Sequence, residues 1–226
     1  MFLLMLWLGM WQLDRARQKE ARHAEYVANQ RLAPCASLGC LSVLAGQTTS
    51  LGHRVTLSNP DWMPQRILLD NQVHQGKAGY LLLQVLDTRP AILVQRAWVG
   101  AAPERDELPP MPTFEEGDLL RAALAWPPAT GLQFAATAPA EPMGPDTVRL
   151  QSLDRQSLSA LLGREIAPMI LRELPVGAGG PMRPWREPAS GADRHRAYAL
   201  QWFSMSAVLV LVYWNYRRQR HGAPDH

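Results

Sequence analysis

Two apolar segments near the ends of the chain enclose a middle region with a different pattern. Residues Tyr198 to Tyr216 contain no charged side chain and are mostly Ala, Leu, Val, Trp, Tyr and Phe. Because a helix rises about 1.5 Å per residue, a segment of about twenty apolar residues crosses a hydrocarbon layer about 30 Å thick. The pattern predicts a transmembrane helix over residues 193–217 and a basic tail over residues 218–226.

The N-terminal apolar segment, residues 1–13, is shorter and contains one polar side chain, Gln12. A helix of about 13 residues is roughly 20 Å long, which is less than a full crossing. We nevertheless predict a first transmembrane helix here, and its shortness has two explanations: a start that omits some residues, or a bilayer that adapts to a short helix. A cleaved secretory signal is disfavoured, because no basic region and no small-residue cleavage site precede the charged stretch.

Residues 14–34 predict a helical stalk, because charged residues of both signs follow one another and neither Gly nor Pro occurs before Pro34. Cys35 and Cys40 come next. In an oxidising compartment this pair is able to form a local disulfide, and in a reducing one the two residues are ordinary thiols. A metal clip is only weakly indicated, since two soft ligands alone do not complete a site.

Residues 35–192 have the pattern of a β-rich domain, with short apolar runs between turn residues. We predict a mostly β fold, a small antiparallel barrel or sandwich with a few helices, between the two transmembrane α-helices. The predicted strands are LSVLA (41–45), RVTLS (54–58), QRILLD (65–70), YLLLQVLD (80–87), AILVQRAWV (91–99), LQFAA (132–136), VRLQS (148–152) and PMILREL (168–174).

One helix is predicted inside this region. Asp154 has the character of an N-cap, an apolar stripe at helical spacing follows, and Gly163 ends the pattern. Residues 115–127 stay ambiguous, because Ala, Leu, Arg and Glu favour a helix while the flanking Pro-rich segments suit another strand.

Composition narrows the function. The chain has 226 residues, of which 47% are hydrophobic and 19% charged, and its net charge is +3. Its basic residues are scattered among acids rather than clustered with aromatic residues, so we predict no nucleic-acid partner. The chain contains no G-x-S-x-G, H-E-x-x-H or Walker motif, and we predict that it is not an enzyme.

Four motifs together resemble the Surfeit locus protein 1 family, and the resemblance covers nearly the whole chain. They are LGMWQLDRARQK beside the first apolar segment, GKAGYLLLQVL, LVQRAWV, and HRAYALQWF entering the second. Members of that family assist cytochrome c oxidase assembly, and two transmembrane helices bracket a β-rich domain that faces the periplasm or the mitochondrial intermembrane space. One departure is Ala97, where the family pattern has glycine.

The resemblance implies a role for His195, because bacterial members are thought to bind haem a through a histidine at this place. Neutral imidazole is a common axial haem ligand, and the membrane interface suits a macrocycle with an apolar body and charged propionates. On a helix, Tyr198 and Trp202 lie along the same face as His195. Arg194 or Arg196 is able to meet a propionate. A histidine that merely anchors the helix at the interface is the alternative.

Trp11 and Arg15 lie at the matching edge of the first apolar segment, together with Gln12. Trp11 and Arg15 are four residues apart and share a helix face. They form either a second wall of the haem site or an aromatic belt with a snorkelling arginine. By contrast, we predict structural roles for Tyr80, Arg96 and Trp98, with Arg96 and Trp98 on one face of a strand.

The function implied is that of a bacterial inner-membrane assembly factor that binds haem a non-covalently and supports its insertion into the oxidase. Its expected partners are cytochrome c oxidase subunit 1, other assembly factors and the lipid bilayer. Copper handling and a pure protein-scaffold role are the alternatives. As a multi-pass protein it would have both termini in the cytoplasm and its main domain in the periplasm. The basic C-terminal tail obeys the positive-inside rule, whereas the basic residues of the stalk oppose it.

Overall fold

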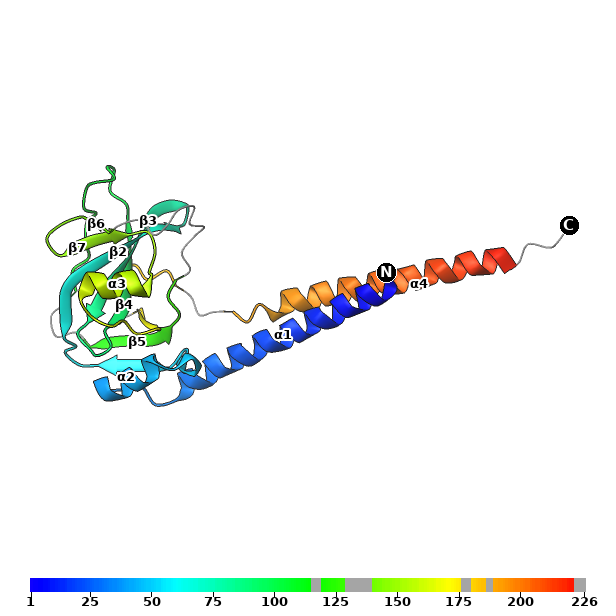
Figure 1. Ribbon diagram of the computed structural model, residues 1–226, viewed down its shortest axis with the longest axis horizontal. Coiled ribbons are helices and arrows are strands. Elements are labelled where there is room, and N and C mark those ends of the chain that lie inside the picture. The colour runs from blue at the N-terminus through cyan, green and yellow to red at the C-terminus, as the bar shows by residue number, and fades with distance from the viewer. Residues whose placement is uncertain (115–118, 129–139, 176–179, 186–188, 222–226) are drawn as a thin grey trace. The chain divides into compact units, whose positions relative to one another are not determined.

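The computed structural model describes residues 1–114, 119–128, 140–175, 180–185 and 189–221. Two compact units divide the chain: Met1–Glu25 with Glu187–His226, and Tyr26–Arg186. Figure 1 traces their elements. These are α1 (Phe2–Arg31), α2 (Leu38–Ala45), η1 (Thr48–Ser50), β1 (Arg54–Leu57), β2 (Trp62–His74), β3 (Lys77–Leu86), β4 (Ile92–Gly100), β5 (Leu120–Ala125), β6 (Glu141–Pro142), β7 (Thr147–Leu150), α3 (Arg155–Leu162), β8 (Ile170–Glu173) and α4 (Ala192–His221).

The second unit is built on one mixed sheet of eight strands in the order β1-β5-β8-β4-β3-β2-β7-β6. The predicted purely antiparallel topology is therefore wrong, although the β-rich character is confirmed. Two of the pairs are parallel, β2 with β7 and β4 with β8. Parallel neighbours need a crossover connection. After β7, helix α3 carries the chain across the sheet to β8, which lies between β4 and β5.

Most predicted strands are confirmed, and the ambiguous segment 115–127 contains strand β5. The predicted strand LQFAA lies outside the described residues. The run LSVLA, by contrast, lies in helix α2, whose N-cap Ser37 accepts a hydrogen bond from the Cys40 amide at 3.2 Å. A short apolar run is consistent with a buried strand or a buried helix turn, and the cap together with the packing of Leu41 and Ala45 into the core decides for the helix.

Helix α3 has the predicted boundaries. The Asp154 side chain accepts a hydrogen bond from the Ser157 amide at 2.8 Å, and Gly163 ends the helix in the left-handed region at φ 63°. Hydrogen bonds from the Ser157 amide and hydroxyl lower the pKa of Asp154. Leu158 and Leu162 are buried against the sheet. Burial of this apolar stripe gives the helix its stability, because eight residues are too few for an independent helix.

Cys35 and Cys40 are joined by a disulfide, with their Cα atoms 5.9 Å apart. Cys35 is also part of the sheet edge, because its amide donates to the Arg54 carbonyl at 2.9 Å and its carbonyl accepts from the Thr56 amide at 2.9 Å. The disulfide loop therefore covers part of the exposed edge of β1, which otherwise invites strand pairing with another chain.

We predict that both thiols of the native protein resist alkylation until a reductant is added. Mass spectrometry of membranes treated with iodoacetamide, with and without prior reduction, measures this directly. Replacing Cys35 by serine should lower the free energy of unfolding by no more than about 2 kcal/mol, because the disulfide closes a short loop. Alkylation of both cysteines without reductant would contradict the prediction.

A register shift in β4 changes the environment of Arg96. Opposite β3, Leu82 pairs with Ala97 and Leu83 with Gln95, so Arg96 is an extra residue that breaks the alternation of the strand. Arg96 consequently lies over the rings of Trp62 and Phe114, at 4.6 and 3.9 Å from their centroids. The prediction that Arg96 and Trp98 share one face of the strand is wrong.

The Trp98 indole instead donates to the carbonyl of Gln72 at 3.0 Å. Ala97 is fully buried and has no positive φ, so alanine meets the backbone requirement at this position.

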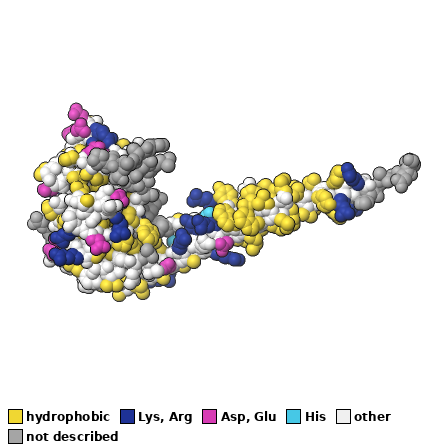
Figure 2. Space-filling view, in the orientation of Figure 1, with side chains coloured by type: hydrophobic (Ala, Val, Ile, Leu, Met, Phe, Trp, Pro, Cys, Tyr) yellow, Lys and Arg dark blue, Asp and Glu magenta, His cyan; other side chains and the backbone are white. Residues whose placement is uncertain are grey.

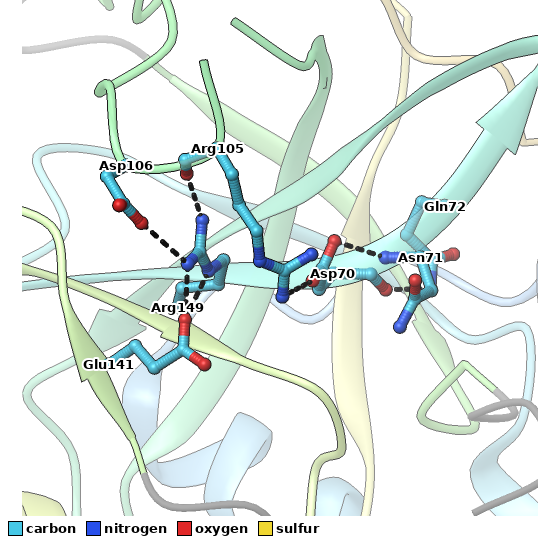
Figure 3. Close-up of polar contacts among 7 residues, drawn as sticks. All are labelled: Asp70, Asn71, Gln72, Arg105, Asp106, Glu141 and Arg149. Carbon is cyan, nitrogen blue, oxygen red and sulfur yellow. Dashed lines mark hydrogen bonds and ion pairs between the residues drawn. The ribbon is translucent and has the colours of Figure 1, made fainter.

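A polar network holds the segment around Arg105 and Asp106, which follows β4, against β2 and β7 (Figure 3). The Arg149 side chain is 4% exposed and contacts Glu141 at 2.7 Å and Asp106 at 3.7 Å, while Arg105 pairs with Asp70 at 3.2 Å. Burial lowers the pKa of Arg149, but hydrogen bonds to Glu141 and Tyr80 more than offset this, and its pKa is raised. These contacts position a loop, and Tyr80 lies buried beside them in an apolar cluster of the sheet.

The first unit contains helix α4 and the greater part of α1. Figure 2 shows hydrophobic side chains along the surface of this helical unit, with Lys and Arg at its two ends. Within the described residues, one helix is long and apolar enough to cross a membrane, Ala192–Arg220 in α4. Helix α1 does not meet this criterion, because Asp14, Arg15 and Arg17 follow its short apolar part. The prediction of two membrane-spanning helices is thus supported only for the second.

Candidate functional site

Helices α1 and α4 pack against each other in antiparallel directions, and small residues form the contact between them. A Cβ atom on Gly9 would lie 2.4 Å from the Phe203 ring, so this position needs glycine for the observed approach. Ala16 and Ala199 are 2% and 1% exposed. Small residues at such contacts let two helix backbones come close together in a membrane. Buried or half-buried residues recur along α4 at spacings of three and four, with Phe203 beside Trp202: Ala192, His195, Ala199, Trp202, Phe203, Ser206 and Leu209.

His195 is half-buried in this contact, and its Nδ1 atom lies 2.7 Å from the Oε1 atom of Gln12. An amide oxygen only accepts hydrogen bonds, so Nδ1 is the donor. In the neutral ring, Nε2 then carries a lone pair. Nε2 makes no hydrogen bond to any residue that the structure describes. With the Gln12 amide oxygen as its partner, a neutral imidazole in this place would thus carry its proton on Nδ1, which is the tautomer that binds a metal through Nε2.

The remaining predicted site residues are placed differently around His195. Trp202 is half-buried in the same contact, two helical turns along α4. Tyr198 and Trp11 are 47% and 46% exposed on the outer faces of their helices. The Arg15 guanidinium is exposed and donates to the Gln18 side chain at 2.9 Å. The exposed rings of Tyr198 and Trp11 are thus available to a ligand on the surface of the helix pair.

Arg196 is already engaged. It lies 2.5 Å from Glu20 on α1 and 3.3 Å from Asp193 on its own helix. Arg194 is exposed and makes no ion pair with a described residue. Of the two arginines considered as partners for a propionate, Arg194 is consequently the one that needs no existing ion pair to be broken.

Gln12 contacts His195, and the sequence did not identify it as part of the site. It was placed only at the edge of the first apolar segment. The available signal was its isolation, because it is the one polar side chain of residues 1–13. A lone amide in an apolar helix is costly without a hydrogen-bond partner. Its partner, however, belongs to a helix 183 residues away along the chain, and a single sequence does not reveal that pairing.

Other candidate chemistry in the described residues is weaker. The disulfide removes the two thiolates on which copper binding would depend, and the described residues contain no group of three or more His, Cys, Asp or Glu side chains arranged for a metal. A cavity of about 580 Å³ lies beside Arg96 and Trp62. There the Arg96 guanidinium is held by Glu173 and by Gln84 at 2.7 Å, an arrangement that fixes the arginine in the core.

Taken together, these features define a membrane-associated protein in which an eight-stranded mixed sheet accompanies an apolar helix with a metal-capable histidine near its polar end. The family model described as the SURF1 family matches residues 1–207, and the chain belongs to this family. The family is an assembly-factor family associated with cytochrome c oxidase. A comparison with curated proteins gave no match.

Proposed function

We propose that this protein binds haem a non-covalently through Nε2 of His195 and supports its insertion into subunit 1 of cytochrome c oxidase. The observation that carries the proposal is the hydrogen bond between His195 Nδ1 and Gln12 Oε1, since it leaves Nε2 as the ligating nitrogen. Haem is the cargo, and the chain's own part is to hold it and release it without transforming it. No C-x-x-C-H motif occurs that would attach it covalently.

The surroundings of His195 suit such a cargo. On the apolar side, Trp202 and Tyr198 offer aromatic surface at the depth of a membrane interface, and Trp11 does so from α1. On the polar side, Arg15 and Arg194 are exposed cations that are able to pair with propionates. A half-buried site at the surface of the helix pair suits a donor, because a carrier that enclosed its cargo tightly could not pass it on.

We further propose a multi-pass arrangement in a bacterial inner membrane, with both termini in the cytoplasm and the sheet in the periplasm. The Cys35–Cys40 disulfide supports an oxidising location for the sheet. The short apolar part of α1 would require the bilayer to adapt around it. A reporter fused after His226 that is active only in the periplasm would contradict this orientation.

The test of the cargo is the variant His195→Ala. It should lose most bound haem, more than any variant of a partner of the ligand, because the iron loses its axial ligand itself, while the sheet stays folded. Absorption spectra of the purified full-length protein, titrated with haem a, measure retention and the Soret band. His53→Ala is the matched control, because it removes a histidine from the sheet unit and should leave the spectrum unchanged.

Trp11→Leu and Arg15→Gln should weaken retention less than His195→Ala, because these side chains would pack against the haem or neutralise it without coordinating iron. If His195→Ala keeps its haem spectrum and still supports oxidase assembly, the ligand assignment is wrong. A scaffold role that acts through protein contacts alone would then explain the family's part in assembly.

A further inference from the structure

We propose that Gln12 is a positioning residue that selects the tautomer of His195 and so prepares Nε2 for iron. This inference deepens the proposed function and rests on it. Gln12 reaches across from α1 to a ring on α4, and the two atoms are 2.7 Å apart. Gln12 would not contact the cargo's iron and would act only through the histidine.

The chemistry of the pair gives Gln12 this role. A neutral imidazole carries its proton on either nitrogen, and a proton on Nε2 would occupy the lone pair that iron needs. Oε1 of Gln12 stabilises the tautomer with the proton on Nδ1. Partners of this kind orient a ligating histidine and raise its basicity, and their removal typically lowers metal affinity about 10–100-fold.

Packing of the two helices brings Gln12 within reach of the ring. Gly9 lies three residues before Gln12 and Ala16 four residues after it, so all three share one face of α1. Ala16 is buried, and Gly9 admits the Phe203 ring where a Cβ atom would collide with it. On α4, Ala199 is buried one turn from His195. Small residues on both helices therefore leave room beside the pair for the two side chains to meet at 2.7 Å.

The first experiment uses the haem-free, full-length protein in lipid nanodiscs. Nitrogen-15 NMR of labelled histidine, assigned by comparison with His195→Ala, should show His195 protonated at Nδ1 and unprotonated at Nε2. Gln12→Leu should shift the population toward the Nε2-protonated tautomer. Gln201→Leu is the control, because it removes the same group from an exposed position on α4 and should change nothing. An unaltered tautomer in Gln12→Leu overturns the inference.

The second experiment measures haem a retention and the reduction potential of the bound iron. Gln12→Leu should bind haem at least about tenfold more weakly. Gln12→Glu keeps an acceptor at Nδ1 and adds negative charge, so it should restore retention and lower the potential. Such a rescue separates the effect of the hydrogen bond from a general loss of helix packing. Equal haem retention and equal reduction potential in the unsubstituted protein, Gln12→Leu and Gln12→Glu would contradict the role of Gln12.

The two proposals fail in distinguishable ways. If His195→Ala retains haem, the ligand assignment fails, while the NMR result on haem-free protein still decides whether Gln12 selects the tautomer. If His195→Ala loses haem and Gln12→Leu matches the unsubstituted protein in every measurement, the cargo proposal stands and Gln12 has no positioning role.

Discussion

Replacing Glu173 with alanine is expected to lower the free energy of unfolding by about 3–5 kcal/mol, because it removes one partner of a buried ion network. One carboxylate oxygen of Glu173 accepts from Arg96, and the other accepts from Arg183 at 2.7 Å. The side chains of Arg96 and Glu173 are 5% and 8% exposed. Without the carboxylate, two guanidinium groups lose a buried counter-charge that solvent cannot replace.

Denaturant unfolding of the full-length protein in detergent, followed by tryptophan fluorescence, measures this loss. Glu165→Ala is the matched control, because Glu165 is an exposed glutamate in the same unit and its removal should change the midpoint little. Glu173→Gln should fall between the two, since it keeps hydrogen-bond acceptance but not the charge. A Glu173→Ala midpoint equal to that of Glu165→Ala would show that the network contributes nothing to stability.

Gly79→Ala is expected to destabilise the sheet by about 3 kcal/mol, at the upper end for an overpacked core. A Cβ atom on Gly79 would lie 2.3 Å from the Val99 carbonyl oxygen and 2.4 Å from the Trp98 ring. The Trp98 ring is held by its hydrogen bond to Gln72, and the carbonyl belongs to the neighbouring strand. Relief of the clash therefore requires β3 and β4 to separate.

The same unfolding measurement applies, with Gly144→Ala as the control, because no atom lies within 4 Å of a Cβ built at Gly144. Gly144 also has no positive φ, so alanine should be neutral or slightly stabilising there. If Gly79→Ala unfolds at the same denaturant concentration as Gly144→Ala, the close approach of β3 and β4 at this position tolerates a methyl group.

Local patterns predicted most individual elements correctly. Helix α3 has the boundaries that Asp154 and Gly163 indicate, and the apolar runs of β2, β3 and β4 form strands. These elements depend on caps, turns and hydrophobic periodicity, which are properties of neighbouring residues. The segment LSVLA was predicted wrongly because its five residues are too few to separate a period of 2 from one of 3.6.

Strand order and register depended on contacts between distant segments. The parallel pairs β2–β7 and β4–β8 join strands that lie far apart along the chain. The sequence of an apolar run does not identify the strand with which it pairs. The extra residue at Arg96 reverses the alternation within one strand, so Arg96 and Trp98 do not share the face that the sequence pattern predicted. The sheet is mixed rather than purely antiparallel for the same reason, because its parallel pairs depend on contacts between distant strands.

At the candidate site, the order of residues alone indicated an apolar helix with His195 at its edge. About twenty consecutive uncharged residues follow a titratable ring there, and this pattern can be read without knowing any tertiary contact. The four motifs further indicated the family, which the match over residues 1–207 shows. The partner of His195 emerged only from the packed helices. Gln12 meets His195 in the contact between α1 and α4, where Ala16 and Ala199 are buried and Gly9 lies against the Phe203 ring, and such a contact depends on side chains of both helices at once.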